Sequence, residues 1–154
     1  MAPRTTPQRR ADVIAKLEER EADAWVASAS ASGDVHLVPL SLAWHEARMV
    51  LATAPDSLTA RNIVGSSVAR LALGGTRDVV MIDAVLDRAV TLSEAPAGLA
   101  EAFAEQTDWD PRSSPDDVVL LLLRPQRIQA WREEDEIAGR TVMRHGEWIT
   151  PAPL

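Results

Sequence analysis

The alternation of apolar and polar residues divides the chain into one leading helix and a series of short strands. Val13, Ile14 and Leu17 form an apolar stripe at helical spacing, so we expect an amphipathic helix over about 10–22. After residue 24 the period falls to two, which is typical of strands with one buried face. We expect strands over 25–30, 35–44, 49–54, 68–73, 79–90, 118–123 and 128–131, helices over 58–64 and 97–106, and a last hairpin over 143–149. The turns are short, so the pattern predicts a mainly β, antiparallel fold.

Some of these segments carry a more detailed prediction. The even positions of 79–90 are apolar, so one face of that strand is expected in the core, with Asp83 and Asp87 on the other face. Six consecutive apolar residues at 118–123 indicate a strand that is covered on both faces. The helix over 97–106 is expected to bury Leu99 and Phe103.

The length of 154 residues fits a single domain. Two prolines and no apolar period precede the first helix, so we expect a flexible arm over 1–9 and one domain over 10–154. The acidic run 133–136 is expected to be a solvated loop.

Composition excludes several classes of function. The chain has no cysteine, and its net charge of −7 disfavours nucleic-acid binding. No apolar run is long enough for a membrane span, and no signal-peptide pattern follows the basic N-terminus, so we expect a cytoplasmic protein. His36, His45 and His145 lack a second ligand at metal-binding spacing, so we expect no metal site.

The segment 53–62 carries the most suggestive chemistry. A strand ends, a helix begins, and hydroxyl groups gather at its first turn, where Asp56 or Ser57 can cap the helix. Free N–H groups at a helix start bind anions, and Ser57, Thr59 and Arg61 can add donors. The same pattern also fits an ordinary capped helix with an exposed arginine.

The five tryptophans contrast with one phenylalanine and no tyrosine. We expect Trp25 in the core, whereas Trp131 and Trp148 are candidates for contact with a ligand or a partner subunit. Arg4, Arg9 and Arg10 can reach an anionic ligand, although a mobile arm is the simpler expectation.

The ordered segments resemble the pyridoxamine 5′-phosphate oxidase-like family of flavin-binding split barrels. The resemblance spans about 11–90 and rests on the segments 24–30, 33–40, 50–54, 57–63 and 77–80. It implies a six-stranded antiparallel split β-barrel with short flanking helices. It also implies a homodimer with cofactor sites at the interface between the two chains.

The resemblance also implies roles for particular residues. The strand through Val38, Pro39, Leu40 and Ser41 would meet the flavin ring with main-chain groups, helped by Thr53. The phosphate would be held at the helix start, by Ser57, Thr59, Ala60, Arg61 and Asn62. Trp131 and Arg140 match the C-terminal part of the family loosely and are further candidates.

These roles imply an FMN-dependent oxidoreductase acting on a small organic substrate or a reduced nicotinamide. The cofactor performs the chemistry, so we expect no catalytic side chain. Basic residues commonly occupy the positions of Leu58 and Thr59 in the vitamin-processing oxidases, and here Arg61 is the one cation of that stretch. Two alternatives stay open: a reductase that uses the deazaflavin coenzyme F-420, and a dimer that binds a flavin without turnover. The lack of a suitably placed histidine argues against haem.

Overall fold

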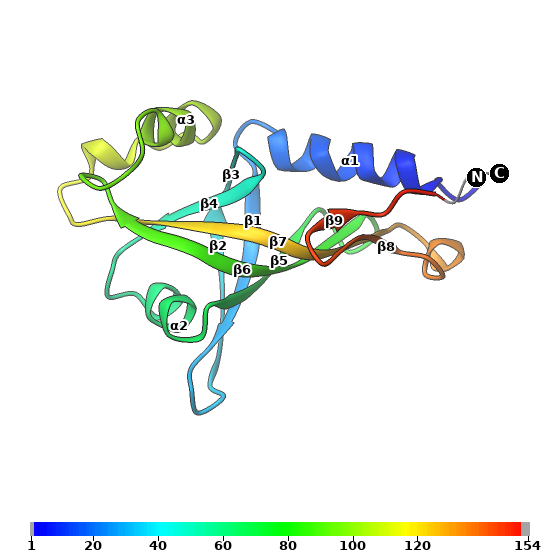
Figure 1. The fold of residues 1–154 in the computed structure, drawn as a ribbon, viewed down its shortest axis with the longest axis horizontal. Helices are drawn as coiled ribbons and strands as arrows, with labels where there is room; N and C mark the ends of the chain where they lie inside the picture. The colour runs from blue at the N-terminus through cyan, green and yellow to red at the C-terminus, as the bar shows by residue number, and fades with distance from the viewer. Residues whose placement is uncertain (1, 152–154) are drawn as a thin grey trace.

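The computed structural model describes residues 2–151, and these form three α-helices and nine strands (Figure 1). The helices are α1 (Thr6–Glu18), α2 (Leu58–Ser66) and α3 (Leu99–Gln106). The strands are β1 (Asp23–Ala29), β2 (Val35–Ser41), β3 (Ala43–His45), β4 (Arg48–Thr53), β5 (Val68–Leu73), β6 (Val79–Thr91), β7 (Val119–Trp131), β8 (Thr141–Arg144) and β9 (Glu147–Trp148). Short 3-10 turns occupy Pro111–Ser113 and Glu134–Glu136. No helix in this part of the chain is long and apolar enough to cross a membrane.

All strand pairs are antiparallel, in the order β2-β1-β5-β6-β7-β4-β3, with β8 and β9 added beside β7. The two ends of this order, β2 and β3, are consecutive in the chain and are separated only by Leu42. Leu42 is fully buried, and its N–H donates to the Ala22 carbonyl, so the chain turns inward there. The sheet therefore curls back on itself without closing. The mainly β antiparallel prediction is confirmed, but the described residues form nine strands instead of six.

Two apolar clusters lie on opposite faces of the curled sheet. The larger one fills its interior and is covered by Val13 and Leu17 of α1 and by Ile63 of α2. The smaller one lies on the outside, where Leu99 and Phe103 of α3 pack on β4, β6 and β7. Alternate residues of 118–123 enter the two clusters, so the prediction of a strand covered on both faces is confirmed.

A β-bulge at Asp87 changes which residues of β6 face the interior. Leu86 pairs with Leu123, whereas Arg88 pairs with the adjacent Leu122, so Asp87 is the extra residue. Even-numbered residues up to Ala84 enter the interior cluster, but Val90 lies in the outer one. The prediction that even positions share one face is therefore wrong beyond the bulge, because the added residue reverses the alternation.

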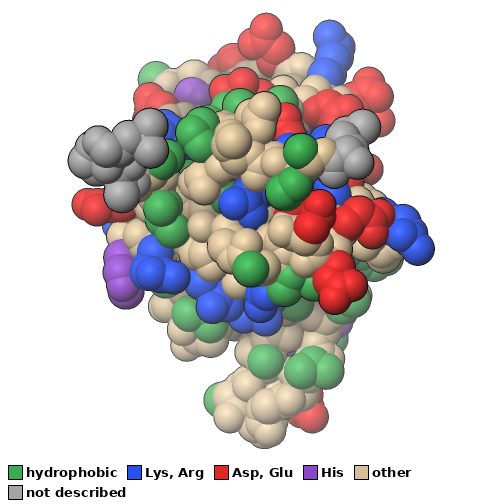
Figure 2. Space-filling model, turned by 90° about the vertical axis from the view of Figure 1, so that its right-hand side faces the viewer, with side chains coloured by type: hydrophobic (Ala, Val, Ile, Leu, Met, Phe, Trp, Pro, Cys, Tyr) green, Lys and Arg blue, Asp and Glu red, His purple; other side chains and the backbone are tan. Residues whose placement is uncertain are grey.

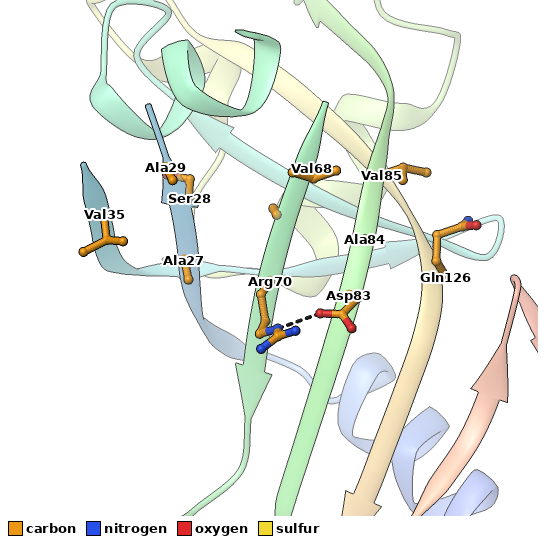
Figure 3. Close-up of a pocket in the computed structure, with 11 residues that line it drawn as sticks. Ala27, Ser28, Ala29, Val35, Val68, Arg70, Asp83, Ala84, Val85 and Gln126 are labelled. Carbon is orange, nitrogen blue, oxygen red and sulfur yellow. Dashed lines mark hydrogen bonds and ion pairs between the residues drawn. The ribbon is translucent and has the colours of Figure 1, made fainter. Parts of the chain in front are cut away.

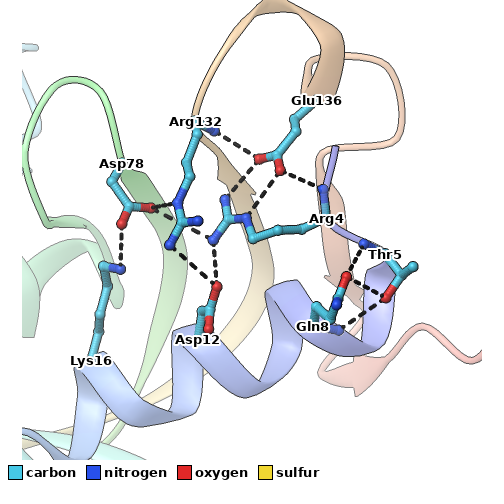
Figure 4. Close-up of polar contacts among 8 residues, drawn as sticks. All are labelled: Arg4, Thr5, Gln8, Asp12, Lys16, Asp78, Arg132 and Glu136. Atoms are coloured by element: carbon cyan, nitrogen blue, oxygen red, sulfur yellow. Dashed lines mark hydrogen bonds and ion pairs between the residues drawn. The ribbon is translucent and has the colours of Figure 1, made fainter. Parts of the chain in front are cut away.

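The predicted start of the first helix is also wrong. Helix α1 begins at Thr6, because Thr5 and Gln8 form a capping box in which each side chain bonds the other's main chain. Arg4, just before it, donates to the carboxylate of Glu136 at 2.7 Å and to Asp12 at 2.7 Å (Figure 4). The segment 4–9 is thus held by specific contacts. The division into an arm and a single domain stays a prediction.

Glu136 is likewise not the solvated residue that we expected. Its side chain is only 4% exposed and accepts hydrogen bonds from Arg4 and from the Arg132 N–H (Figure 4). The hydrogen bond from Arg4 lowers the pKa of Glu136 to about 2, although burial acts in the opposite direction. Asp78 joins the same network through Arg4, at 3.6 Å, and Arg132, at 3.4 Å. It also pairs with Lys16 at 2.9 Å. The network ties the segment before α1 to the turn that follows β7.

The β1–β2 hairpin protrudes from the body of the molecule, at the bottom of Figures 1 and 2. Its turn is closed by the Ser30 N–H, which donates to the Asp34 carbonyl, and Gly33 adopts a φ of 86°. Val35, at the start of β2, is 88% exposed. The hairpin therefore presents apolar surface away from both clusters.

Candidate functional site

Helix α2 begins as the sequence predicts. Ser57 is the N-cap, and its Oγ accepts a hydrogen bond from the Ala60 N–H at 3.1 Å. Thr53, the last residue of β4, donates its hydroxyl hydrogen to the same Oγ at 3.1 Å. The end of β4 and the start of α2 are thus joined through one oxygen atom.

These two bonds determine what Ser57 can offer a ligand. A hydroxyl oxygen has two acceptor positions and one hydrogen to donate. The Ala60 N–H and the Thr53 hydroxyl occupy both acceptor positions. The hydrogen of Ser57 is therefore left to donate away from the helix. Arg61, one turn along, is exposed and makes no ion pair within residues 2–151. Both groups are placed to meet an anion.

The other residues expected at the phosphate are buried. Thr59 is 2% exposed, Ala60 1% and Asn62 8%. The Asn62 amide donates to Ser28 Oγ on β1 at 3.2 Å, so it fastens α2 to the sheet. Side-chain donors at this helix start are therefore Ser57 and Arg61, with main-chain N–H groups beside them.

His36 lies close to this helix, a position that the sequence analysis did not predict. On β2 it is the cross-strand partner of Ser28, and paired residues project on the same face of a sheet. Ser28 in turn contacts α2 through Asn62. His36 is half-buried and lies beside this contact. Only the register between β1 and β2 reveals this neighbourhood, which sequence spacing alone does not show.

Strand β2 presents the residues expected to meet a flavin ring. It pairs only with β1, so every second main-chain N–H and C=O along its other edge is free of sheet pairing. Val38 and Leu40 are half-buried, and Pro39 is exposed on the opposite face. Ser41 donates to Asp23 at 3.3 Å. The free edge offers the main-chain groups that the expected role requires.

Trp131 and Arg140 do not lie near the start of α2 in one chain. Thr53 pairs with Val119, at the opposite end of β7 from Trp131. Twelve strand residues span roughly 40 Å. Arg140 lies over the Trp131 ring, with its guanidinium carbon 5.7 Å from the ring centroid. These two residues form a separate pair, and only a second copy could bring them to the α2 site.

The outer face of β2, β1, β5 and β6 is apolar, and no helix of residues 2–151 covers it. We call this surface the outer face. Trp25 is 52% exposed on it, so its predicted core position is wrong: it projects on the face opposite the buried Ala24 and Val26. Leu37 and Val68 are also more than half exposed.

A trough of about 540 Å³ crosses the outer face, lined by Ala27, Ala29, Val35, Val68 and Val85 among others (Figure 3). A second hollow of about 370 Å³ beside it shares Ala27 and Arg70. The trough arises because alanines stand between larger side chains.

One charged row crosses the same face. Asp83 accepts from Arg70 through Oδ1 at 2.6 Å and from Arg127 through Oδ2 at 2.9 Å. In the same register, the next positions across the sheet are apolar: Ala27 on β1 and Leu37 on β2. Both carboxylate oxygens of Asp83 already have arginine partners within the chain. A second molecule that covers the surrounding apolar surface would therefore not strand an unpaired charge.

Comparisons with known proteins bear on the fold. No family model matches the chain, and no curated protein matches it either. Solved structures do match. An F420 reductase superposes with a TM-score of 0.58 at 15% identity, covering 74% of this chain and 94% of that one.

Two further structures are similar to the same extent. A putative pyridoxamine 5′-phosphate oxidase from Listeria innocua gives a TM-score of 0.61 at 12% identity, covering 80% of this chain and 98% of that one. HutZ, a heme storage protein from Vibrio cholerae, gives 0.60 at 12% identity, covering 79% and 94%. Identities this low establish the fold alone. The chain has the split β-barrel fold of the pyridoxamine 5′-phosphate oxidase-like proteins.

Proposed function

We propose that this protein is an FMN-dependent oxidoreductase that acts on a small organic substrate or a reduced nicotinamide. The observation that carries the proposal is the start of α2, where Ser57 has its hydroxyl hydrogen left to donate and Arg61 has no partner among residues 2–151. Together with the adjacent main-chain N–H groups, these donors fit a phosphate monoester. They are fewer than the sequence suggests, because Thr59 and Asn62 are buried.

The chain's own residues would position the cofactor. Ser57 and Arg61 hold the phosphate, and the free edge of β2 from Val38 to Ser41 supplies main-chain donors and acceptors to the ring edge. A bound flavin supplies hydride and single-electron transfer. Hydrogen bonds from β2 would tune that chemistry, and no side-chain acid or base is required of the protein.

We also propose that the protein works as a homodimer joined through the outer face. An exposed apolar surface of this kind marks an association site in soluble proteins. A second copy is the occupant that we favour, because the outer face adjoins α2: Val68, which lines its trough, begins β5 two residues after α2 ends. A partner seated there would cover the region beside α2 and β2. A second copy is also what Trp131 and Arg140 need to reach a cofactor.

A deazaflavin-dependent reductase is the second candidate. One observation favours it: the F420 reductase shares this fold over 94% of its own length. A phosphate site with a single arginine also fits a longer ligand whose main contacts with the protein lie away from the phosphate. A dimer that binds a flavin without turnover would use the same residues, and only assays of turnover separate it from an enzyme.

Binding of FMN by the Arg61→Ala variant tests the phosphate assignment. Loss of a charge-assisted hydrogen bond is expected to weaken binding by about tenfold or more. Arg20→Ala is the matched control, because Arg20 is an exposed arginine that makes no ion pair among residues 2–151 and lies beside α3 instead of α2 or Trp131. Fluorescence titration of FMN gives both dissociation constants. Equal affinities for the wild type and Arg61→Ala would overturn the phosphate assignment. A separate assay tests turnover: oxidation of a reduced nicotinamide by the FMN-loaded protein would establish it.

A further inference from the structure

A hollow lined by two arginines lies on the other side of the molecule, beside α3. It has a volume of about 160 Å³ and is lined by the β3–β4 turn, the β6 bulge and the segment that leads into α3. Its polar lining is formed by His45, Glu46, Arg48, Asp87 and Arg88. None of these residues takes part in the α2 site, which lies across the sheet.

The bulge explains why two charged residues face this hollow together. In a regular strand, Asp87 and Arg88 would project on opposite faces. Because Asp87 is the extra residue of the bulge, both side chains line the hollow. Arg88 also pairs with Leu122, which belongs to the cluster beneath α3. The backbone irregularity therefore brings a cation to this place.

The acidic group in the hollow is already neutralised. Asp87 Oδ2 accepts from Arg48 Nε at 2.7 Å, and Oδ1 lies 3.3 Å from Arg124 Nε. Glu46 is 78% exposed and lies 3.9 Å from His45. The Asp87 carboxylate thus has two arginine partners, whereas the Glu46 carboxylate projects into solvent.

Donors remain after these contacts. Arg48 uses one N–H for Asp87 and one for the Glu46 carbonyl, which leaves three of its five N–H groups without a partner in residues 2–151. Arg88 makes no hydrogen bond or ion pair in that part of the chain. The hollow therefore holds arginine N–H groups without a partner, although Glu46 and Asp87 balance the charge of its two arginines.

We infer that this hollow binds a small oxyanion of the phosphate type, held by Arg48 and Arg88 with His45 at its edge. The volume suits one compact anionic group and is too small for a flavin. Arg48 is the preorganised donor, because Asp87 and the Glu46 carbonyl fix its guanidinium. Arg88 supplies the second charge from the bulge. The site is independent of the cofactor proposal.

Titration of the ¹⁵N-labelled protein with inorganic phosphate tests this inference residue by residue. We expect saturable shifts of the Arg88, Ala97 and Leu99 amides, and at least a fivefold weaker affinity in Arg88→Gln, whose side chain makes no hydrogen bond or ion pair among residues 2–151. Arg61→Gln is the matched control and should leave these shifts unchanged while altering those of α2. Shifts confined to α2, shifts that never saturate, or an unchanged affinity in Arg88→Gln would overturn the site.

Discussion

Arg4 donates to both carboxylate oxygens of Glu136, through Nε at 3.0 Å and Nη2 at 2.7 Å, across 132 residues of sequence. The two side chains are only 11% and 4% exposed. Removal of one partner from a buried ion pair leaves an uncompensated charge. We therefore predict that Arg4→Met lowers the free energy of unfolding by about 3 kcal/mol.

Chemical denaturation measures this loss, and Arg20→Met is the control, because Arg20 is exposed and makes no ion pair in the described residues. The double variant Arg4→Met/Glu136→Gln should recover part of the stability, since it removes the stranded charge. An Arg4→Met variant as stable as the control would show that the pair has no energetic role.

The same pair predicts how stability depends on pH. The folded-state pKa of Glu136 lies near 2, below its ordinary value of 4.5, chiefly because of the hydrogen bond from Arg4. A lowered pKa stabilises the fold above pH 4.5, and this contribution is lost as the pH falls towards 2. The loss is about 3 kcal/mol. Asp78 acts in the same direction, because the hydrogen bonds from Lys16 and Arg132 outweigh the effect of its burial and lower its pKa.

Unfolding free energies measured between pH 6 and pH 3 show this decline. The Glu136→Gln variant should show a clearly shallower slope than the wild type, because the main titrating group is gone. Parallel pH profiles for the two proteins would rule out Glu136 as the source.

Local patterns predicted the parts of the fold that depend on neighbouring residues. The cap at Ser57 and the burial of Leu99 and Phe103 follow from spacing within one helix, and the structure confirms them. Long-range contacts explain the errors. Glu136 is buried because Arg4 reaches it from the other end of the chain, and the exposure of Trp25 depends on which face of the sheet lacks a helix.

In the candidate site, too, local features are predictable from the sequence, whereas features set by long-range packing are not. The helix start and its exposed Arg61 were visible in the sequence, because capping is a local property. The burial of Thr59 and Asn62 was not visible, since it depends on how α2 packs against β1. His36 enters the picture only through the β1–β2 register.

Asn62 gives a prediction that separates a structural role from a ligand-binding role. Asn62→Ala removes the hydrogen bond to Ser28 and leaves a buried hydroxyl without that partner. We expect a stability loss of about 1–2 kcal/mol by thermal or chemical denaturation. The affinity for FMN should change much less than in Arg61→Ala. An Asn62→Ala variant with full stability and lost FMN binding would instead make Asn62 a direct phosphate ligand.

The outer face predicts the effect of one charge on assembly. Leu37 is 60% exposed at the edge of the second hollow, and Leu37→Asp would place an unpaired carboxylate in a dimer interface. Light scattering at micromolar concentration should give a dimer for the wild type and a monomer for Leu37→Asp. Ala15→Asp is the control, because Ala15 is exposed on α1, which covers the interior cluster, and it does not line the trough or the second hollow. A monomeric wild type would contradict the proposed dimer and the sharing of a cofactor site between chains.

The visible absorption spectrum of the purified protein after incubation with FMN and removal of free ligand tests the central claim most directly. The proposed function predicts a flavin spectrum that elutes with the dimer at about one FMN per chain, and a clear loss of bound flavin in Arg61→Ala. Retention of the deazaflavin or of haem in place of FMN, or of none of the three, would contradict an FMN-dependent oxidoreductase.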